Sequence, residues 1–413
     1  MLWNRVLLGI LGLLLMTACQ PQVVMVEVTR LVDGQGTAGA VLSTPSPPAQ
    51  TPPAEAPAAD APIVTRLVEV AVTRVVPQEI LVELTRAPLG SAARPVQLLF
   101  APTVETAVIS RRGAILVEAL QAATGRTFVL GIADSEPALV DLMCAAPADT
   151  IGFLSPLGYV QARAQCGVQP GSVGVGGDSF TWQAGMLVTR RDSGLNSLED
   201  LAGASWAVPD ERSIIGYRAF QALLADSGIA PGEIVPVTGE SAAMLAVLAG
   251  EADFATAAYT PPILPFDERP WAYGSDSPEV WRRLGISPSR SPIGYVLVNG
   301  EPEFGGYRLR DARARIFDIA PEIYDQTQIV TLSGQVPNGA VAFGADFPLG
   351  LAREVLAVLD EFVAAGTCAD SLCAADFYGW TGLAPLADDA YDAIRFMQAT
   401  LDLAPEQLWE MTP

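Results

Sequence analysis

The feature that most constrains the fold is a regular alternation of short apolar runs and helix-like spacing that starts near residue 95. The runs PVQLLFAP (95–102), RTFVLGIA (126–133) and DTIGFL (149–154) read as strands, and helical apolar spacing follows each of them. The same alternation continues over 183–259. Strands that alternate with helices predict an α/β fold with mainly parallel sheets. A chain of 413 residues is long enough for two such lobes and further segments.

The N-terminal segment MLWNRVLLGILGLLLMTACQ has the features of an export signal. Arg5 precedes an apolar run over 6–16, which is too short to span a bilayer and typical of a signal peptide. The residues that end at Cys19 resemble the lipobox of bacterial lipoproteins. We therefore expect residues 1–19 to be a lipoprotein signal peptide and Cys19 to carry the lipid that anchors the protein outside the cytoplasm. An uncleaved anchor and a plain signal peptide are the alternatives.

Residues 20–94 differ in composition from the rest of the chain. TPSPPAQTPPAEAPAADAP (44–62) is rich in proline and alanine and predicts an extended, disordered tether. A Thr-Arg element recurs around it, in VEVTRLV (26–32), IVTRLVEVAVTRVV (63–76) and LVELTRAP (81–88). These repeats are too few and too irregular for a solenoid. They are either tether sequence of strand-like composition or a short hairpin for self-association.

The composition excludes several classes of function. The chain has no histidine, which removes Ser-His-Asp and Cys-His nucleophile systems and the commonest zinc ligand. The glycine-rich run SVGVGG (172–177) does not precede a helix, so we expect a flexible turn and not a dinucleotide loop. The net charge is −22, and no polybasic stretch indicates nucleic acid binding. We expect no catalysis, no cofactor and no metal.

Four cysteines follow Cys19, namely Cys144, Cys166, Cys368 and Cys373. An even number in an exported chain predicts two disulfides, for which three pairings exist. We favour Cys144–Cys166 and Cys368–Cys373, because each pair is local in sequence. A four-cysteine zinc site is the alternative.

Four predicted helices open with a serine directly after a strand or loop: Ser135, Ser155, Ser213 and Ser241. Serine is a preferred N-cap, so each alone has a structural explanation. In an α/β sheet, however, these turns lie at the carboxyl edge, where ligands bind. Helix N-termini there offer free N–H groups and a positive dipole end. Together they predict an anion site that needs no basic residue.

Several segments, in order, resemble periplasmic substrate-binding proteins of the phosphate, phosphite and phosphonate uptake type. They are LLFAPTVETAVISRRGAILVEALQAATG, ADTIGFLSPLGYVQA, TGESAAMLAVLAGEADFATAAY and GQVPNGAVAFGADFPLGLAREVLAVL, and with the crossover segment they cover most of 95–400. The second contains Asp149, Phe153, Pro156 and Tyr159 of a family motif. The resemblance implies a bilobal, type II periplasmic-binding-protein-like fold. Its two α/β lobes are joined by two crossover strands.

The resemblance also implies boundaries. Lobe 1 is expected to comprise about 95–185 and 341–413, and lobe 2 about 190–332, with crossings near 184–190 and 333–343. Within lobe 2, residues 261–310 look like an insertion rich in proline and aromatic residues. It either covers the cleft or packs on the outside of the lobe.

By this resemblance the protein is a monomeric receptor that delivers a small anionic, phosphonate- or phosphate-like ligand to an ABC permease. The expected contacts are Thr103, Glu105, Ser155, Tyr159, Ser213, Ile215, Gly216, Ser241 and Tyr259. The family's Ser-Thr-Ser-Gly loop reads Ser-Ile-Ile-Gly at 213–216, and Ala242 replaces a histidine. Each lost donor weakens oxyanion binding by about 1–3 kcal/mol, which favours a less charged or more apolar solute. A receptor that signals to a membrane sensor without transport is the alternative.

Overall fold

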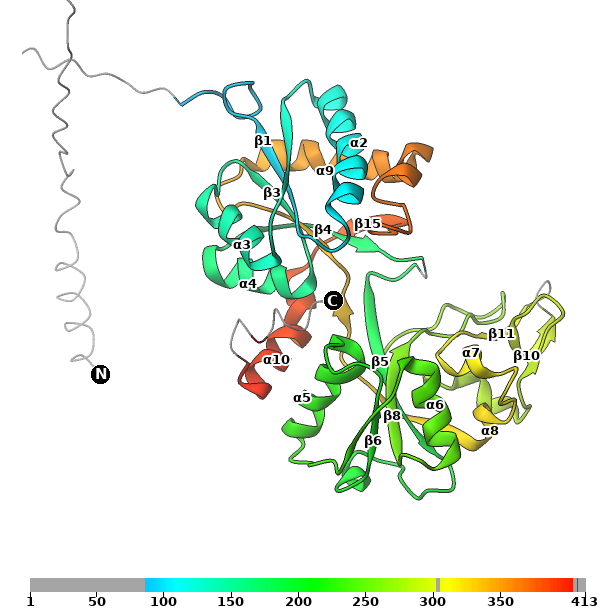
Figure 1. Cartoon of the computed structure of the whole chain (residues 1–413). Coiled ribbons are helices and arrows are strands. Elements are labelled where there is room, and N and C mark those ends of the chain that lie inside the picture. The colour runs from blue at the N-terminus through cyan, green and yellow to red at the C-terminus, as the bar shows by residue number, and fades with distance from the viewer. Residues whose placement is uncertain (1–85, 178, 302–304, 404–406, 408–413) are drawn as a thin grey trace, which may run out of the picture. The chain divides into compact units, whose positions relative to one another are not determined.

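The structure is a computed structural model, which describes residues 86–177, 179–301, 305–403 and 407 (Figure 1). The predicted signal peptide, Cys19 and the tether up to residue 85 lie outside the described residues. In the described part of the chain, no helix combines the length and apolarity needed to cross a membrane.

The first sheet, which defines lobe 1, has six strands in the order β15-β4-β14-β3-β1-β2. Strand β1 is parallel to β2 and β3, whereas β14 and β15 run antiparallel to their neighbours. The expectation of mainly parallel sheets is therefore wrong, because β14 returns from the other lobe and runs against β3 and β4, and β15, which follows α9 within lobe 1, runs against β4. The strands are β1 (Val96–Phe100), β2 (Phe128–Ile132), β3 (Thr150–Leu154), β4 (Gln169–Val175), β14 (Ala340–Phe343) and β15 (Gly382–Pro385).

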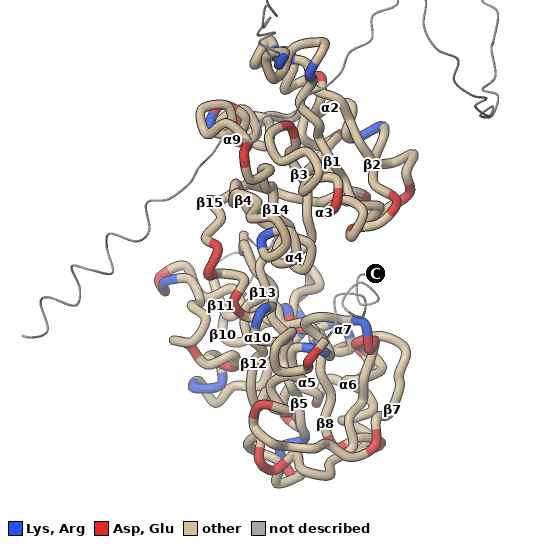
Figure 2. Tube along the Cα trace, turned by 90° about the vertical axis from the view of Figure 1, so that its left-hand side faces the viewer, with Lys and Arg blue, Asp and Glu red and all other residues tan. Residues whose placement is uncertain are grey.

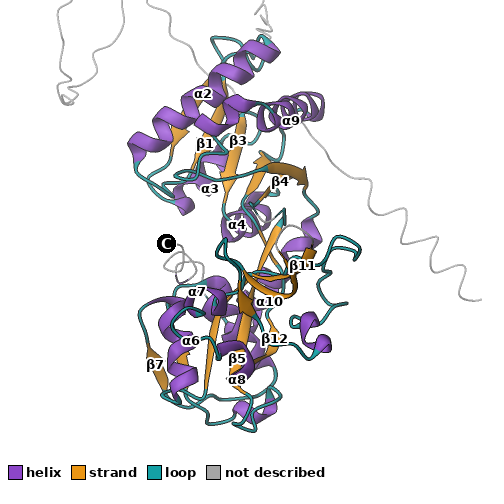
Figure 3. Cartoon of the chain, turned by 90° about the vertical axis from the view of Figure 1, so that its right-hand side faces the viewer, coloured by secondary structure: helices purple, strands orange, loops and turns teal. Residues whose placement is uncertain are grey.

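Helices cover both faces of this sheet (Figure 3). Val96, Leu98 and Phe100 of β1 share one apolar cluster with α2 (Thr106–Thr124) and α9 (Leu349–Ala364). Leu99 points to the other face, where it joins α3 (Glu136–Ala145) and α4 (Pro156–Cys166). Because both faces are buried, the central strands β1, β3 and β14 carry no charged residue (Figure 2).

The second sheet, which defines lobe 2, has the order β12-β5-β8-β6-β7, with β13 paired to β5. The π-helical turn η2 (Ile214–Arg218) and α5 (Ala219–Asp226) lie on the opposite side of β5, β6 and β8 from α6 (Gly239–Ala249) (Figure 1). The strands are β5 (Trp182–Arg190), β6 (Trp206–Val208), β7 (Ile234–Pro236), β8 (Phe254–Tyr259), β12 (Thr327–Leu332) and β13 (Val336–Pro337).

The aromatic-rich segment 261–310 packs onto lobe 2. It contains η3 (Val280–Leu284) and a three-stranded antiparallel sheet of β9 (Ser289–Arg290), β10 (Val296–Glu301) and β11 (Gly305–Leu309). Trp271, Trp281 and Tyr307 belong to the same apolar cluster as Met186 of β5. The short helices α7 (Arg313–Ile316) and α8 (Ile323–Gln326) follow and lead back to β12.

Two crossing segments connect the sheets. One runs from β4 to β5, and the other runs from β12 to β14 through β13, which pairs with β5 at Gln183 and Trp182. Ser333 fixes the second crossing, since its Oγ accepts from the N–H of Gly185 at 2.8 Å and its carbonyl accepts from the Tyr273 hydroxyl at 2.5 Å. Helix α10 (Asp392–Leu401) contacts both α4 and α5. The remaining short helices are η1 (Glu199–Leu201), η4 (Gly366–Asp370) and η5 (Asp388–Tyr391).

The globular part begins earlier than predicted. Residues 86–94 form a turn in which Arg86 and Arg94 both bind Asp149, the former at 2.8 Å. The Thr127 N–H donates to the Gly90 carbonyl at 2.7 Å. The tether therefore does not extend to residue 94, because these contacts join its predicted last residues to lobe 1.

The glycine-rich run at 172–177 is not a flexible turn, so that prediction is wrong. Most of it lies in β4, between β14 and β15. A Cβ on Gly174 would collide with the indole of Trp380, and a Cβ on Gly171 with the ring of Phe343. The small residues are needed because aromatic rings lie directly against the strand.

Both favoured disulfides are present. Cys144–Cys166 joins the C-terminal turns of α3 and α4, with Cα atoms 5.5 Å apart. Cys368–Cys373 closes the η4 loop, with Cα atoms 5.1 Å apart. Each bond removes conformational freedom from the unfolded chain.

Candidate functional site

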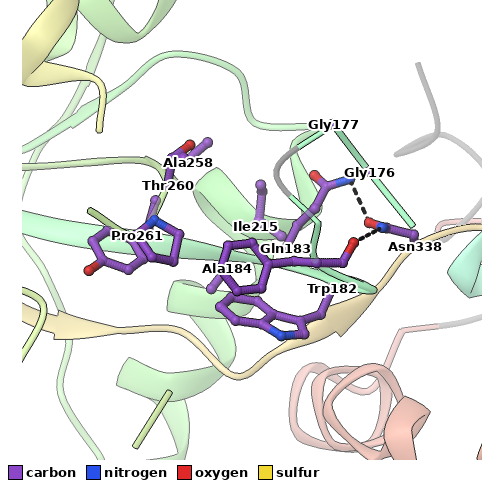
Figure 4. A pocket seen from close by; sticks show the side chains of 12 residues that line it. Gly176, Gly177, Trp182, Gln183, Ala184, Ile215, Ala258, Thr260, Pro261 and Asn338 are labelled. Atoms are coloured by element: carbon purple, nitrogen blue, oxygen red, sulfur yellow. Dashed lines mark hydrogen bonds between the residues drawn. The ribbon is translucent and has the colours of Figure 1, made fainter. Parts of the chain in front are cut away.

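A pocket of about 200 Å³ lies where the crossing segments meet the ends of β5 and β8 (Figure 4). The N-terminal part of β5, the C-terminal end of β8 and the crossing residue Asn338 supply most of its wall. Its lining consists of Gly176, Gly177, Phe180, Trp182, Gln183, Ala184, Ile215, Ala258, Tyr259, Thr260, Pro261 and Asn338. None of these side chains carries a charge.

Aromatic rings and amides give the pocket its chemistry. The ring centroids of Phe180 and Trp182 are 4.9 Å apart, and Trp182 meets Tyr273 edge-on at 5.5 Å. Gln183 Nε2 donates to Asn338 Oδ1 at 3.3 Å, and these side chains point toward each other (Figure 4). Asn338 Nδ2 donates to the carbonyls of Gly174 and Phe180, both at 2.9 Å. Asn338 therefore ties the two crossing segments together and fixes this side of the pocket.

The Ser213 loop enters the site from lobe 2. Ser213 is the predicted N-cap, and its Oγ accepts from the Gly216 N–H at 2.9 Å. The Gly216 carbonyl accepts from the Thr256 hydroxyl, which in turn accepts from Trp206 Nε1 at 3.0 Å. Ile215 lines the pocket, and Ile214 and Ile215 also pack against the apolar cluster that contains α3, α4 and α10. Both isoleucines therefore have a packing role, besides the place of Ile215 in the pocket wall.

Tyr259 and Ser241 were predicted as further contacts of lobe 2. Tyr259 lines the pocket, but its hydroxyl donates to the Pro278 carbonyl at 3.0 Å, and burial raises its pKa. The prediction that α6 opens at Ser241 is wrong, because α6 starts at Gly239 with Thr238 in the N-cap position. Glu240 in its first turn accepts from the Ala258 N–H at 2.6 Å, directly behind the pocket wall.

In lobe 1 the predicted N-cap Ser155 has partners of its own. Its Oγ accepts from the Gly158 N–H at 3.1 Å, and its N–H and Oγ both donate to Glu136. Tyr159 is buried, its hydroxyl donates to Asp388 Oδ1 at 2.7 Å, and burial raises its pKa.

Thr103 and Glu105 lie in the exposed loop between β1 and α2. Glu105 takes the N-cap position of α2 without a side-chain capping bond. Of the nine predicted contacts, the structure brings Ile215 and Tyr259 to the pocket. The other seven do not line it: Thr103, Glu105, Ser155, Tyr159, Ser213, Gly216 and Ser241.

Sequence reasoning missed Phe180, Trp182, Gln183 and Asn338. Their position in the sequence could have indicated them, since each lies in or near a predicted crossing between the lobes. Within the described ranges, no group of three or more cysteine, aspartate or glutamate side chains is placed to hold a metal ion.

Two α/β lobes joined by two crossing segments, with an uncharged pocket at the crossings, make up the bilobal fold of type II periplasmic binding proteins. The model of one family, described as the ABC transporter phosphonate periplasmic substrate-binding protein, matches residues 98–391. The chain belongs to this family. Membership implies an extracytoplasmic location, a small-molecule ligand and an ABC permease as partner.

Solved structures resemble the chain at low identity. PhnD1 from Prochlorococcus marinus, in complex with methylphosphonate, is 13% identical with a TM-score of 0.37 and covers 74% of this chain and 98% of its own. A binding component of an ABC phosphonate transporter from Pseudomonas aeruginosa is 15% identical with a TM-score of 0.36, covering 78% and 94%. The protein XAC2383 from Xanthomonas citri, bound to ATP, is 14% identical with a TM-score of 0.43, covering 74% and 96%. No curated protein matches the chain significantly.

Proposed function

We propose that this protein is a lipid-anchored receptor that binds a small phosphonate-like anion with an apolar substituent and delivers it to an ABC importer. The observation that carries this proposal is the pocket at the crossings, in a chain of the phosphonate-binding family. Cys19 provides the anchor, and the residues between Cys19 and the globular part provide reach. The protein acts as a monomer and catalyses no reaction.

The lining supports a ligand with a singly charged anionic group at one end and an apolar substituent at the other. At the start of the helix that begins at Ile214, the Gly216 N–H donates to Ser213 Oγ, so we assign the negative group to the N–H of Ile215, the residue of this turn that lines the pocket. No lysine or arginine lines the pocket to neutralise a second charge. The rings of Phe180, Trp182 and Tyr259 instead offer apolar surface. A monoanion with an aryl or alkyl substituent therefore fits better than inorganic phosphate.

Calorimetric titration of the full chain tests this proposal. The ligands are phenylphosphonate, methylphosphonate and inorganic phosphate, with the neutral dimethyl methylphosphonate as control. We expect one site per chain, with phenylphosphonate bound most tightly and the neutral compound not bound. Saturation at about 100 times Kd stabilises the folded state by about 2.7 kcal/mol, which a thermal shift assay detects. Tightest binding of phosphate, or no binding of any anion, contradicts the proposed ligand.

A further inference from the structure

A second pocket, here called the outer pocket, adjoins the pocket at the crossings. It has a volume of about 640 Å³, and it shares Gly177 and Phe180 with the crossing pocket of about 200 Å³. Most of the rest of its wall comes from the stretch 262–271, in the aromatic-rich segment of lobe 2. The two pockets are therefore neighbours that meet at Gly177 and Phe180.

One aromatic wall runs along both pockets. The ring of Phe180, which lines both, lies 4.9 Å from the ring of Trp182 in the crossing pocket, measured between centroids. Trp271 lines the outer pocket, and its ring lies 6.4 Å from Trp182 and 5.5 Å from Tyr259, which both line the crossing pocket. Because neighbouring rings span the boundary, apolar surface continues from one pocket into the other.

The outer pocket also exposes apolar side chains that the fold does not bury. Phe266 is 80% exposed and Ile263 is 42% exposed, and both belong to its wall. A Cβ on Gly305 would lie 3.3 Å from the Phe266 ring, so this ring lies beside the start of β11. Single exposed apolar residues need no explanation, but several that line one hollow are typical of a binding surface.

The charged side chains in the described part of this wall, Glu268 and Arg310, have partners within the protein. Glu268 accepts from Arg283 at 2.7 Å and from the Tyr307 hydroxyl. Arg310 donates to the Pro261 carbonyl at 2.9 Å. Since both groups are engaged, the surface that the outer pocket offers a ligand is mainly apolar.

We propose that the outer pocket is a second subsite, which binds the far end of an alkyl chain whose anionic head lies in the crossing pocket. The ligand class is then that of long-chain alkylphosphonates. The inference rests on the proposed function, because that function places the anionic group in the crossing pocket. A volume of about 200 Å³ is below the roughly 300–1,000 Å³ of typical ligand pockets, and the outer pocket brings the site into that range.

Calorimetric titration of the full chain with butylphosphonate and octylphosphonate, each below its critical micelle concentration, tests this inference. The readout is the ratio of the two affinities, because effects on the anionic head cancel in it. Each further methylene group buried in the outer pocket should raise the affinity about fourfold, which equals about 0.8 kcal/mol. We expect octylphosphonate to bind at least about tenfold more tightly than butylphosphonate, since burial of two further methylene groups is enough for this gain.

Two substitutions test where the chain lies. Phe266→Ser removes the exposed ring from the outer pocket, and Gly177→Leu adds a side chain to the shared wall, where a Cβ would meet no atom within 4 Å. Both should lower the affinity ratio by at least about fourfold, the effect of one buried methylene group. The control is Phe396→Ser, because Phe396 is 41% exposed and lines a separate pocket between α5 and α10. It should keep the ratio of the wild type.

The outcomes distinguish this inference from the proposed function. Equal binding of both phosphonates by the wild type, or a ratio that Phe266→Ser does not lower, overturns the inference and leaves the receptor function intact. If Phe266→Ser does not fold, Gly177→Leu decides. An equal loss in Phe396→Ser also overturns it, because the chain would then bind exposed apolar surface without a defined site.

Butanesulfonate and octanesulfonate repeat the test with another anionic head. A chain-length gain that Phe266→Ser lowers, in a protein that binds these sulfonates but no phosphonate, supports the outer pocket and rejects the proposed ligand. Binding of neither series rejects both the inference and the proposed ligand.

Discussion

At the scale of single residues, the buried arginine of α7 shows how this acidic chain uses its few cations. The Arg313 side chain is 0% exposed, and it pairs with Glu279 at 2.6 Å and with Asp311 at 2.9 Å. Its guanidinium also lies 4.6 Å from the centroid of the Tyr324 ring. The ion pairs hold α7 and the 261–310 segment together inside the core of lobe 2.

Removal of this cation takes the paired arginine from the buried Asp311 and one of three arginines from Glu279, which keeps Arg191 and Arg282. We expect Arg313→Met to lower the free energy of unfolding by about 3–5 kcal/mol, measured in urea. The matched control is Arg315→Met on the same short helix, because Arg315 is 67% exposed and its pair with Glu240 contributes about 0–1 kcal/mol. Similar losses in both variants would contradict the assignment of the core role to Arg313.

Glu136 predicts a pH dependence of stability with a definite sign. Burial raises its pKa in the folded state above the ordinary value of 4.5, although the Ser155 hydrogen bonds lower it in part. The contribution of this carboxyl to the unfolding free energy is therefore fully present below about pH 4.5. It is lost as the pH rises through the folded-state pKa. We expect the unfolding free energy of the wild type, minus that of Glu136→Gln, to fall across this window. A difference that rises with pH would show that the carboxylate is stabilised, not strained, by its site.

At the scale of elements, features that depend on residues close in sequence were predicted well, whereas features that depend on distant residues were not. Ser135, Ser155 and Ser213 are N-caps as expected, since capping depends on a serine and the residues just after it. The start of α6 was misplaced by two residues, from Gly239 to Ser241, because Thr238 takes the N-cap position without a side-chain bond that would mark it. Strand β4 was missed because its glycines serve the distant Trp380 and not a local turn.

The π-helical turn η2 allows a direct test of which isoleucine faces the ligand. Ile215 lines the pocket and Ile214 does not. We expect Ile215→Ser to bind phenylphosphonate more tightly, by roughly the 1.5–3 kcal/mol of one hydrogen bond to a charged group. Ile214→Thr, the control, should leave the affinity nearly unchanged and lower only stability, since it removes apolar packing. A gain in the control that equals the gain in Ile215→Ser would mean that the pocket is not the ligand site.

At the scale of the whole molecule, the ordered family-like segments predicted two lobes and two crossings, but the pocket depends on pairs far apart in sequence. Asn338 and Gln183 are separated by 155 positions and meet only after both crossings have formed. Gln183 lies at the start of β5 and Asn338 follows the short strand β13, and no local pattern marks either side chain as part of a site. For the same reason the aromatic wall around Trp182 could not be predicted from composition.

Asn338 links the two crossing segments, so its removal should affect both folding and binding. Asn338→Ala loses its bonds to the Gly174 and Phe180 carbonyls and should lower the free energy of unfolding by roughly 1–3 kcal/mol. Because the pocket wall then loosens, the affinity for phenylphosphonate should fall by about tenfold. Asn196→Ala is the control, since Asn196 is exposed and bonds the nearby Gly194 carbonyl. Calorimetry and urea unfolding of both variants separate the two effects, and unchanged affinity in Asn338→Ala would place ligand recognition away from the crossings.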